Sequence, residues 1–174
     1  GLLFVSFLLQ YFVRILQIGG NENADCFMGF GLFFSLWVVI VAKFSDIGAL
    51  LIGKAIGRTK MAPSISPGKT IEGLIGGFAA SAGIGALLPW LFQEKFTDIV
   101  FFGDWIFTPG QGAIWGTLLA LSAVIGDLIA SVLKRLASMK DSGGAIPGIG
   151  GLFDLTDSLI LAAPTGYFIL FLLR

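Results

Sequence analysis

The chain has 174 residues, of which 56% are hydrophobic and 13% are charged, whereas soluble domains carry about 25% charged residues. Its 11 basic and 11 acidic side chains cancel, which excludes the general attraction to phosphate backbones on which nucleic-acid-binding proteins rely. The chain has no histidine and one cysteine, Cys26, which excludes Ser-His-Asp triads, zinc sites and an intrachain disulfide.

Apolar segments long enough to cross a bilayer, which takes about 20 residues, recur along the whole chain. The sequence predicts five spans, at residues 2–18, 27–42, 71–92, 110–126 with a polar helical extension to 137, and 152–173. We therefore expect an all-α, polytopic integral membrane protein with a single membrane domain over residues 1–174. Because Gly1 opens directly into an apolar segment with no basic region before it, we expect a fragment or processed form rather than a signal peptide.

The basic residues are distributed unevenly between the segments that connect these spans. Segments 43–70 and 127–151 carry eight Lys and Arg residues, whereas segments 19–27 and 93–109 carry only Lys95. Lys and Arg are enriched in cytoplasmic loops, so the first two segments are predicted to be cytoplasmic. Strict alternation then places the amino end inside and Arg174 outside.

Polar residues at the end of the fourth span are not explained by membrane crossing. Asp127, Ser131 and Lys134 lie at i, i+4 and i+7, on one face of the predicted helix. One interpretation is a hydrated helix end in which the acid pairs with a lysine. The other is a functional site, because ionisable residues this close to hydrocarbon are costly. The pattern alone supports both equally.

A glycine-rich segment separates the fourth span from the fifth. Residues 140–151 begin with Lys140-Asp141 and contain five glycines, among them Gly148, Gly150 and Gly151. A flexible hairpin is one explanation. An anion-binding loop is favoured by its position, because its amide groups run into the first turn of a helix, where the dipole favours negative charge.

Two acids, Asp154 and Asp157, follow in the first turns of the fifth span. Their i, i+3 spacing places both carboxylates on one helix face. Helix capping explains one of them, since Asp is favourable at an N-terminus. Two acids beside a glycine-rich loop and near Asp127 favour a shared cation, and Mg²⁺ is the usual choice for carboxylates with phosphates.

The segment Ser66-Pro67-Gly68-Lys69-Thr70 is predicted to be a turn that leads straight into a helix. It lacks the spacing of a Walker A loop, because Pro63 stands where that motif requires glycine. Taken alone, the segment is best explained as a basic cytoplasmic loop.

Together these segments resemble the phosphatidate cytidylyltransferase family, the CDP-diacylglycerol synthases. The family's carboxyl-terminal signature is matched without a gap by Ser131, Lys134-Arg135, Lys140-Asp141, Gly143, Pro147, Gly150-Gly151, Asp154 and Asp157. An upstream family block is similar to residues 46–73, so the resemblance covers signature regions 46–73 and 127–157. Three positions depart from the family pattern: Ile149 replaces His, Leu155 replaces Arg and Leu50 replaces Tyr.

The resemblance implies transfer of CMP from CTP to phosphatidate, with Mg²⁺ as cofactor and a second cation at Asp141 as an open alternative. It implies catalytic roles for Asp127, Lys134, Asp154 and Asp157, three of them, Asp127, Asp154 and Asp157, as metal ligands. The substrate-binding residues that it implies are Ser66, Lys69, Thr70, Ser131, Arg135, Lys140, Asp141, Gly148, Gly150 and Gly151.

The same resemblance implies that these residues are the carboxyl-terminal portion of a longer chain, with a site at the cytoplasmic face of a bacterial inner membrane. Membrane lipids would surround the spans, and a homodimer is one open mode of assembly. Two other functions compete with this interpretation. A related CTP-dependent lipid enzyme, such as a CDP-archaeol synthase or a polyprenol kinase, would share the acids. A small cation-coupled transporter would instead place acids and glycine breaks near mid-membrane in corresponding halves.

Overall fold

The computed structural model describes residues 2–18, 24–63, 66–95, 101–102, 105–136 and 152–172. The helices in this part of the chain are α1 (Leu2–Ile18), α2 (Ala24–Ile56), α3 (Ile71–Lys95), α5 (Pro109–Leu136) and α6 (Leu152–Leu172). Two short antiparallel hairpins connect some of them: β1 (Lys60–Ala62) with β2 (Ser66–Thr70), and β3 (Phe101–Phe102) with β4 (Trp105–Ile106). The all-α expectation is confirmed, and these hairpins are the only strands in the described ranges.

Within the described residues, three helical segments are long and apolar enough to cross a bilayer: Gly31–Ile56, Ile71–Phe92 and Pro109–Leu136. The described apolar part of α6, Asp157–Leu172, is shorter, and α1 has 17 residues. The structure therefore supports a polytopic membrane protein. Three of the five predicted spans satisfy the length criterion within the described residues.

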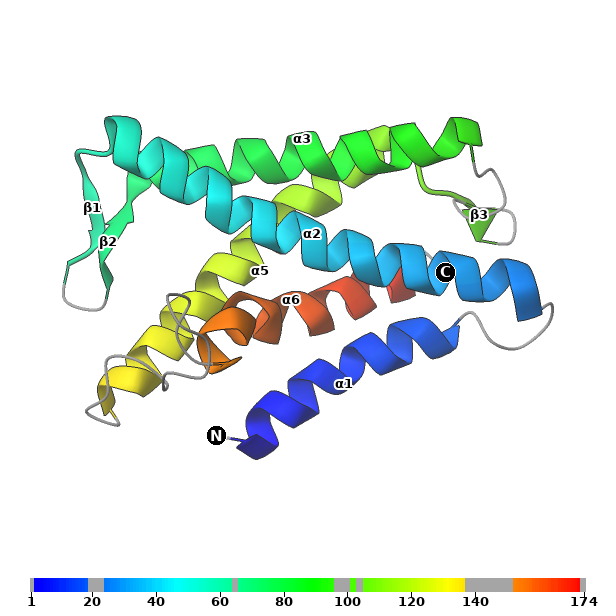
Figure 1. Cartoon of the computed structure of the whole chain (residues 1–174), viewed down its shortest axis with the longest axis horizontal. Coiled ribbons are helices and arrows are strands. Elements are labelled where there is room, and N and C mark those ends of the chain that lie inside the picture. Colours follow the sequence, from blue (N-terminus) through cyan, green and yellow to red (C-terminus); the bar gives the residue numbers. More distant parts are fainter. Residues whose placement is uncertain are drawn as a thin grey trace.

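Successive helices run in alternating directions along the bundle (Figure 1). The end of α2, the β1–β2 hairpin and the start of α3 lie at the same end of the molecule as the end of α5 and the start of α6. The hairpin connection, which contains Arg58, Lys60 and Lys69, and the end of α5, which contains Lys134 and Arg135, therefore lie at the same end. This is the alternation that the distribution of Lys and Arg predicts.

The prediction for the end of the second span was wrong. We expected the span to stop at Ala42 and residues 43–70 to connect it to the next one, but α2 continues to Ile56. The apolar segment that follows Asp46 keeps the helix going, and Gly48 lets it pack closely on α3, because a Cβ at Gly48 would lie 2.5 Å from the Cβ of Ala80. Lys43 and Asp46 are consequently inside a span rather than in a loop.

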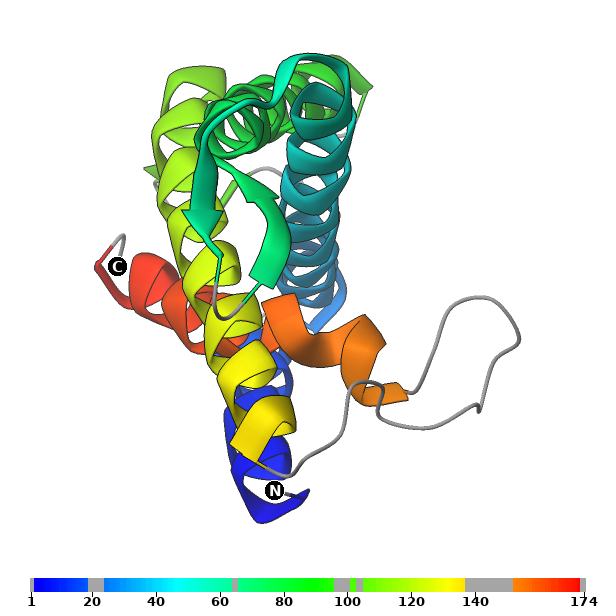
Figure 2. The same ribbon diagram turned by 90° about the vertical axis from the view of Figure 1, so that its left-hand side faces the viewer.

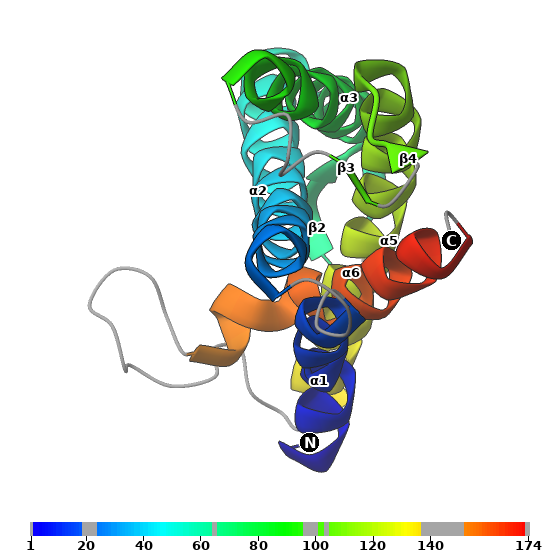
Figure 3. The same ribbon diagram turned by 90° about the vertical axis from the view of Figure 1, so that its right-hand side faces the viewer.

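Helices α2, α3 and α5 form one group, and α1 and α6 pack along one side of it (Figures 2 and 3). The crossing of α3 and α5 depends on Gly85 and Gly112, because a Cβ on either residue would collide with the backbone carbonyl of the other. The core beside this crossing contains Phe34, Trp37 and Phe107, and the Trp37 indole N–H donates to the Gly85 carbonyl at 3.1 Å. Backbones held this close give the polar ends of the helices fixed positions.

Candidate active site

The β1–β2 hairpin is anchored to the first turn of α3. Thr70 caps the helix, since its Oγ1 accepts a hydrogen bond from the Gly73 amide at 3.1 Å. The Ile71 amide donates to the Thr59 carbonyl at 3.0 Å, and the Glu72 carboxylate accepts from the Thr59 amide and, at 2.9 Å, from its hydroxyl. These contacts hold both sides of the hairpin against α3.

The expected turn at residues 66–70 is instead strand β2, and this is a correction. Its partner β1 supplies the pairs Lys60↔Thr70 and Ala62↔Ser66, with an irregular register between them. Pro67 is tolerated because a two-stranded ribbon consists only of edge strands. The Lys60 ammonium donates to the Pro67 carbonyl at 2.8 Å, which closes the hairpin. The predicted helix start directly after Thr70 is confirmed.

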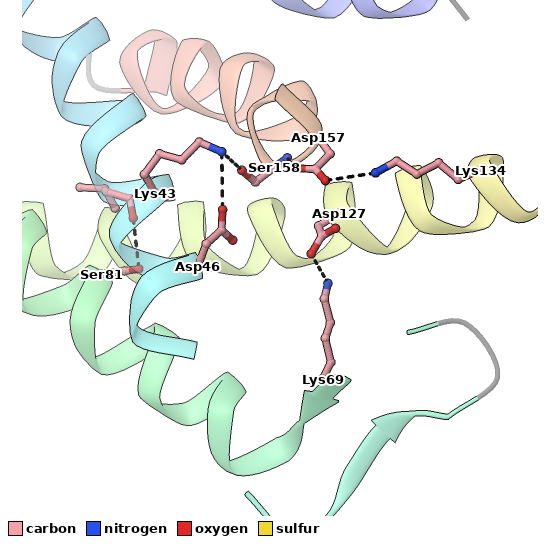
Figure 4. Close-up of polar contacts among 9 residues, drawn as sticks. Lys43, Asp46, Lys69, Ser81, Asp127, Lys134, Asp157 and Ser158 are labelled. Atoms are coloured by element: carbon pink, nitrogen blue, oxygen red, sulfur yellow. Dashed lines mark hydrogen bonds and ion pairs between the residues drawn. The ribbon is translucent and has the colours of Figure 1, made fainter. Parts of the chain in front are cut away.

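Lys69 extends from β2 toward α5, where its Nζ lies 2.6 Å from Asp127 Oδ2 (Figure 4). The two side chains are only 23% and 27% exposed. Lys69 is therefore not the solvated loop cation that the segment alone suggested. Asp127 does pair with a lysine, but the lysine comes from another element of the fold rather than from its own helix.

Lys134 of α5 faces Asp157 of α6, with 3.7 Å between Nζ and Oδ2 and side-chain exposures of 16% and 14%. Gly126 allows this approach, because a Cβ there would lie 3.0 Å from the Asp157 carbonyl oxygen. The Ser158 amide donates to Asp157 Oδ1 at 2.7 Å. Asp157 is thus held between its own helix and a cation from α5.

A third pair, on α2, was not among the predicted site residues. Lys43 Nζ lies 3.7 Å from Asp46 Oδ2 and donates to the Ser158 hydroxyl at 2.8 Å. The sequence offered a signal for it, because a base and an acid three residues apart interrupt an otherwise apolar segment. We missed that signal because we assigned both residues to a loop.

The three carboxylates, Asp46, Asp127 and Asp157, point into the space between α2, α5 and α6, and each has a lysine partner (Figure 4). We call these three Lys–Asp pairs the polar cluster. A cavity of about 310 Å³ adjoins it. The cavity is lined by Asp46, Ala49, Leu50, Met61, Gly68, Lys69, Thr70, Gly73, Leu74, Val124 and Asp127. It therefore combines an apolar wall with charged groups of both signs.

The other predicted site residues lie outside the polar cluster or outside the part of the chain that the structure describes. Ser131 is half-buried on α5, Arg135 is exposed near the end of that helix, and Ser66 lies at the start of β2. Asp154 belongs to α6, but its side chain is outside the described part of the structure. The predicted residues that lie wholly outside the described residues are Lys140, Asp141, Gly148, Gly150 and Gly151.

The side chains available for a metal ion are carboxylates and hydroxyls, which suit a hard cation such as Mg²⁺. Among the side chains that the structure describes, no group of three or more acidic or cysteine side chains is close enough to hold an ion. Asp127 and Asp157 approach the same space from neighbouring helices (Figure 4), and two carboxylates together with substrate phosphate oxygens suit a magnesium ion. The predicted ligand set stays a prediction.

Three bacterial relatives with similar sequences carry the same name. The chain is 40% identical over 129 residues to the phosphatidate cytidylyltransferase of Synechocystis sp., which covers 74% of this chain and 40% of that protein. It is 41% identical over 144 residues to the Haemophilus influenzae protein of the same name, covering 82% of this chain and 48% of that protein. The Bacillus subtilis protein of that name is 31% identical over 168 residues, covering 97% and 55%.

The chain thus spans about half the length of the curated relatives that it matches. Nearly the whole chain is matched by one family model, since residues 2–173 fit a family described as the cytidylyltransferase family. The polar cluster and the hairpin both lie inside the matched region. The chain belongs to the cytidylyltransferase family.

Proposed function

We propose that the protein transfers CMP from CTP to phosphatidate and releases pyrophosphate, so that CDP-diacylglycerol is formed. Membership of the family and the names of three bacterial relatives support this activity. The observation that carries the proposal is the polar cluster: three lysines and three carboxylates beside a cavity, among helices long enough to span a membrane. Such a site can meet a lipid laterally and a soluble nucleotide from the aqueous side.

We place the hairpin end of the bundle on the cytoplasmic side of a bacterial inner membrane. The basic residues Arg58, Lys60 and Lys69 lie in or beside the hairpin, and Lys134 and Arg135 lie at the end of α5 that emerges with it. An excess of Lys and Arg marks the cytoplasmic side of membrane proteins. CTP is a cytosolic nucleotide, so this orientation gives it direct access to the cluster.

The reaction replaces one phosphorus–oxygen bond with another. An oxygen of the lipid phosphate attacks the α-phosphorus of CTP, a new P–O bond forms, and the bond between the α- and β-phosphates breaks as pyrophosphate leaves. The attacking oxygen is already anionic near neutral pH, so no residue needs to remove a proton, which suits a chain without histidine. Catalysis then depends on positioning and on cations that offset the phosphate charges.

The lysines of the cluster provide such cations. We propose that Lys69 and Lys134 hold substrate phosphates, because each is mostly enclosed and already faces a carboxylate in the site. Arg135, Lys140 and the amide groups of the glycine-rich segment are proposed as further phosphate contacts. A charge-assisted hydrogen bond from an enclosed ammonium group is stronger than one from a solvated side chain.

Mg²⁺, when bound, supplies further neutralisation of the phosphates and of the departing pyrophosphate. We propose Asp127, Asp154 and Asp157 as its ligands and Asp141 as a candidate for a second cation. In this arrangement Lys69 and Lys134 stabilise two of these carboxylates in a partly enclosed setting, where unpaired acids would be costly.

A transfer assay with differently labelled CTP tests the proposal. The protein, with any sequence that flanks residues 1–174, is purified in detergent and given phosphatidate, diacylglycerol, a polyprenol or an archaeal-type ether-lipid phosphate. We expect label from the α-phosphate of CTP to enter lipid with phosphatidate as acceptor, with equimolar release of pyrophosphate. Transfer of label from the γ-phosphate to an unphosphorylated acceptor would instead show a lipid kinase, and preference for the ether lipid would show a CDP-archaeol synthase.

A further inference from the structure

Lys43 is an ammonium group at the middle of a membrane span, and the proposed reaction does not yet use it. It lies halfway along the 26-residue segment Gly31–Ile56, with 31% of its side chain exposed. Ionisable residues at this depth are costly to insert and are usually retained for a function, with a specific partner. Its partners therefore indicate what it does.

Lys43 has two such partners on different helices. Its Nζ donates to the Ser158 hydroxyl on α6 at 2.8 Å and lies 3.7 Å from Asp46 Oδ2 on α2 (Figure 4). Ser158 is fully buried, and it directly follows Asp157 in the chain. Lys43 thus links α2 to the turn of α6 that carries a proposed catalytic carboxylate.

The cavity beside the polar cluster is lined by Asp46, Lys69 and Asp127 but not by Lys43. Lys43 therefore does not line the cavity itself, whereas its ion-pair partner Asp46 does. A cation in this position acts on the site through its partners. It attracts the Asp46 carboxylate across 3.7 Å as an ion pair, and its charge-assisted hydrogen bond to Ser158 keeps the Asp157 turn against α2.

We infer that Lys43 is a positioning residue of the transfer site, which presents the Asp46 carboxylate to the cavity. The inference rests on the proposed cytidylyl transfer. It adds to that reaction one residue, Asp46, that faces the substrate cavity and one, Lys43, that acts through it. Neither was among the site residues predicted from the sequence.

Turnover of the Lys43→Met variant is the first measurement. Methionine keeps the length of the side chain and removes its charge, so we expect kcat to fall by about 10- to 100-fold, as for the loss of a hydrogen bond to a charged group. Arg14→Met is the matched control, because it also removes a cation from an apolar helix. Arg14 lies on α1, exposed and over the Tyr11 ring, and takes no part in the three Lys–Asp pairs. We expect this control to keep its turnover.

The double variant Lys43→Met/Asp46→Asn separates positioning from a purely structural role. The Lys43→Met substitution leaves Asp46 without its cation, so the melting temperature of this variant in detergent should fall. Removing both charges in the double variant should restore the melting temperature. If Lys43 acts through Asp46, the double variant stays slow and loses no more turnover than Asp46→Asn alone. Recovery of turnover together with melting temperature would overturn the inference, and so would losses that multiply in the double variant.

The same assay separates this inference from the proposed function. Transfer by the unmodified protein combined with full activity of Lys43→Met refutes the positioning role and leaves cytidylyl transfer intact. No transfer from CTP to phosphatidate by the unmodified protein refutes the proposed function, and the role of Lys43 with it.

Discussion

Asp157 is the most enclosed carboxylate of the polar cluster, with 14% side-chain exposure against 27% for Asp127 and 37% for Asp46. Its two oxygens face different groups, since the Ser158 amide donates to Oδ1 and Lys134 lies nearest Oδ2. An enclosed carboxylate that faces an ammonium group can exchange that contact for a phosphate-bound cation. Substitution at this residue is therefore the sharpest test of the proposed metal site.

Replacing Asp157 or Asp154 with Asn is expected to abolish Mg²⁺-dependent turnover, with a loss of about 10²-fold or more for a group that stabilises charge in the transition state. The amide keeps the shape of the carboxylate and removes its charge, so both variants should remain folded. Turnover is measured across a range of Mg²⁺ concentrations, and folding is checked by gel filtration in detergent. Asp98→Asn is the control, and wild-type activity in both site variants would contradict the metal assignment.

Ile149 tests whether the glycine-rich segment needs an imidazole. If the family's histidine acts as an acid or base, Ile149→His should raise turnover by about 10²- to 10⁴-fold. We expect instead a change of less than about tenfold, equivalent to about 1.4 kcal/mol of barrier, because the anionic nucleophile and the pyrophosphate leaving group need no proton transfer. The turnover of the native protein and of Ile149→His is measured with labelled CTP and phosphatidate. An inactive native protein that is rescued by the His substitution would show that proton transfer matters.

At the scale of helices, glycine contacts determine where the polar residues end up. Gly85 and Gly112 bring the backbones of α3 and α5 into contact, Gly48 does the same for α2 and α3, and Gly126 brings α5 to α6. These interfaces are the close small-residue packing that membrane helices use when no hydrophobic effect drives them together. A shift of one helix would separate Lys69 from Asp127, since the hairpin is anchored on α3 and the acid lies on α5.

A pair of alanine substitutions on α3 tests this packing. Gly85→Ala would place a methyl group against the Gly112 carbonyl, and we expect it to destabilise the protein by about 1–3 kcal/mol, as overpacking does. Gly83→Ala is the matched control, because nothing lies within 4 Å of a Cβ there. It should be neutral or stabilising, since alanine favours a helix by about 1 kcal/mol over glycine. Thermal unfolding in detergent measures both, and equal melting temperatures would contradict the proposed close contact.

For the whole molecule, alternation of helix direction brings the β1–β2 hairpin and the end of α5 to one end of the bundle. Under the proposed function, the positive charge at that end serves two purposes. It orients the chain in the membrane, and it surrounds the polar cluster with cations that attract a nucleotide polyphosphate. The orientation and the location of the site are therefore coupled.

Cysteine labelling from each side of sealed vesicles tests this orientation. In a background without Cys26, we expect cysteines at positions 69 and 140 to react from the cytoplasmic side and those at 98 and 104 from the other. Membrane-impermeant reagents, with permeabilised vesicles as the control for reactivity, give the readout. Reaction of positions 69 and 140 only from the outer side would contradict both the topology and cytosolic access of CTP.

Local pattern was enough to predict most of the helices. The predicted limits of the first span match α1, and those of the fourth and fifth lie within a residue or two of α5 and α6, because long apolar segments with polar ends specify helices almost independently of their neighbours. The i, i+4 and i, i+3 spacings also identified Asp127, Lys134 and Asp157 as candidate site residues, since neighbours on a helix face follow from helix geometry alone.

The pairings within the cluster were decided by the tertiary structure alone. Nothing in the spacing of residues indicates that Lys69 faces Asp127, that Lys134 faces Asp157, or that Lys43 reaches Ser158, because each pair joins elements distant in the chain. The length of α2 was missed for the same reason. Charged residues at 43 and 46 indicate a loop when only local hydropathy is considered, but they stay inside a helix once α6 supplies a partner for the ammonium group and close packing on α3 holds the helix in place.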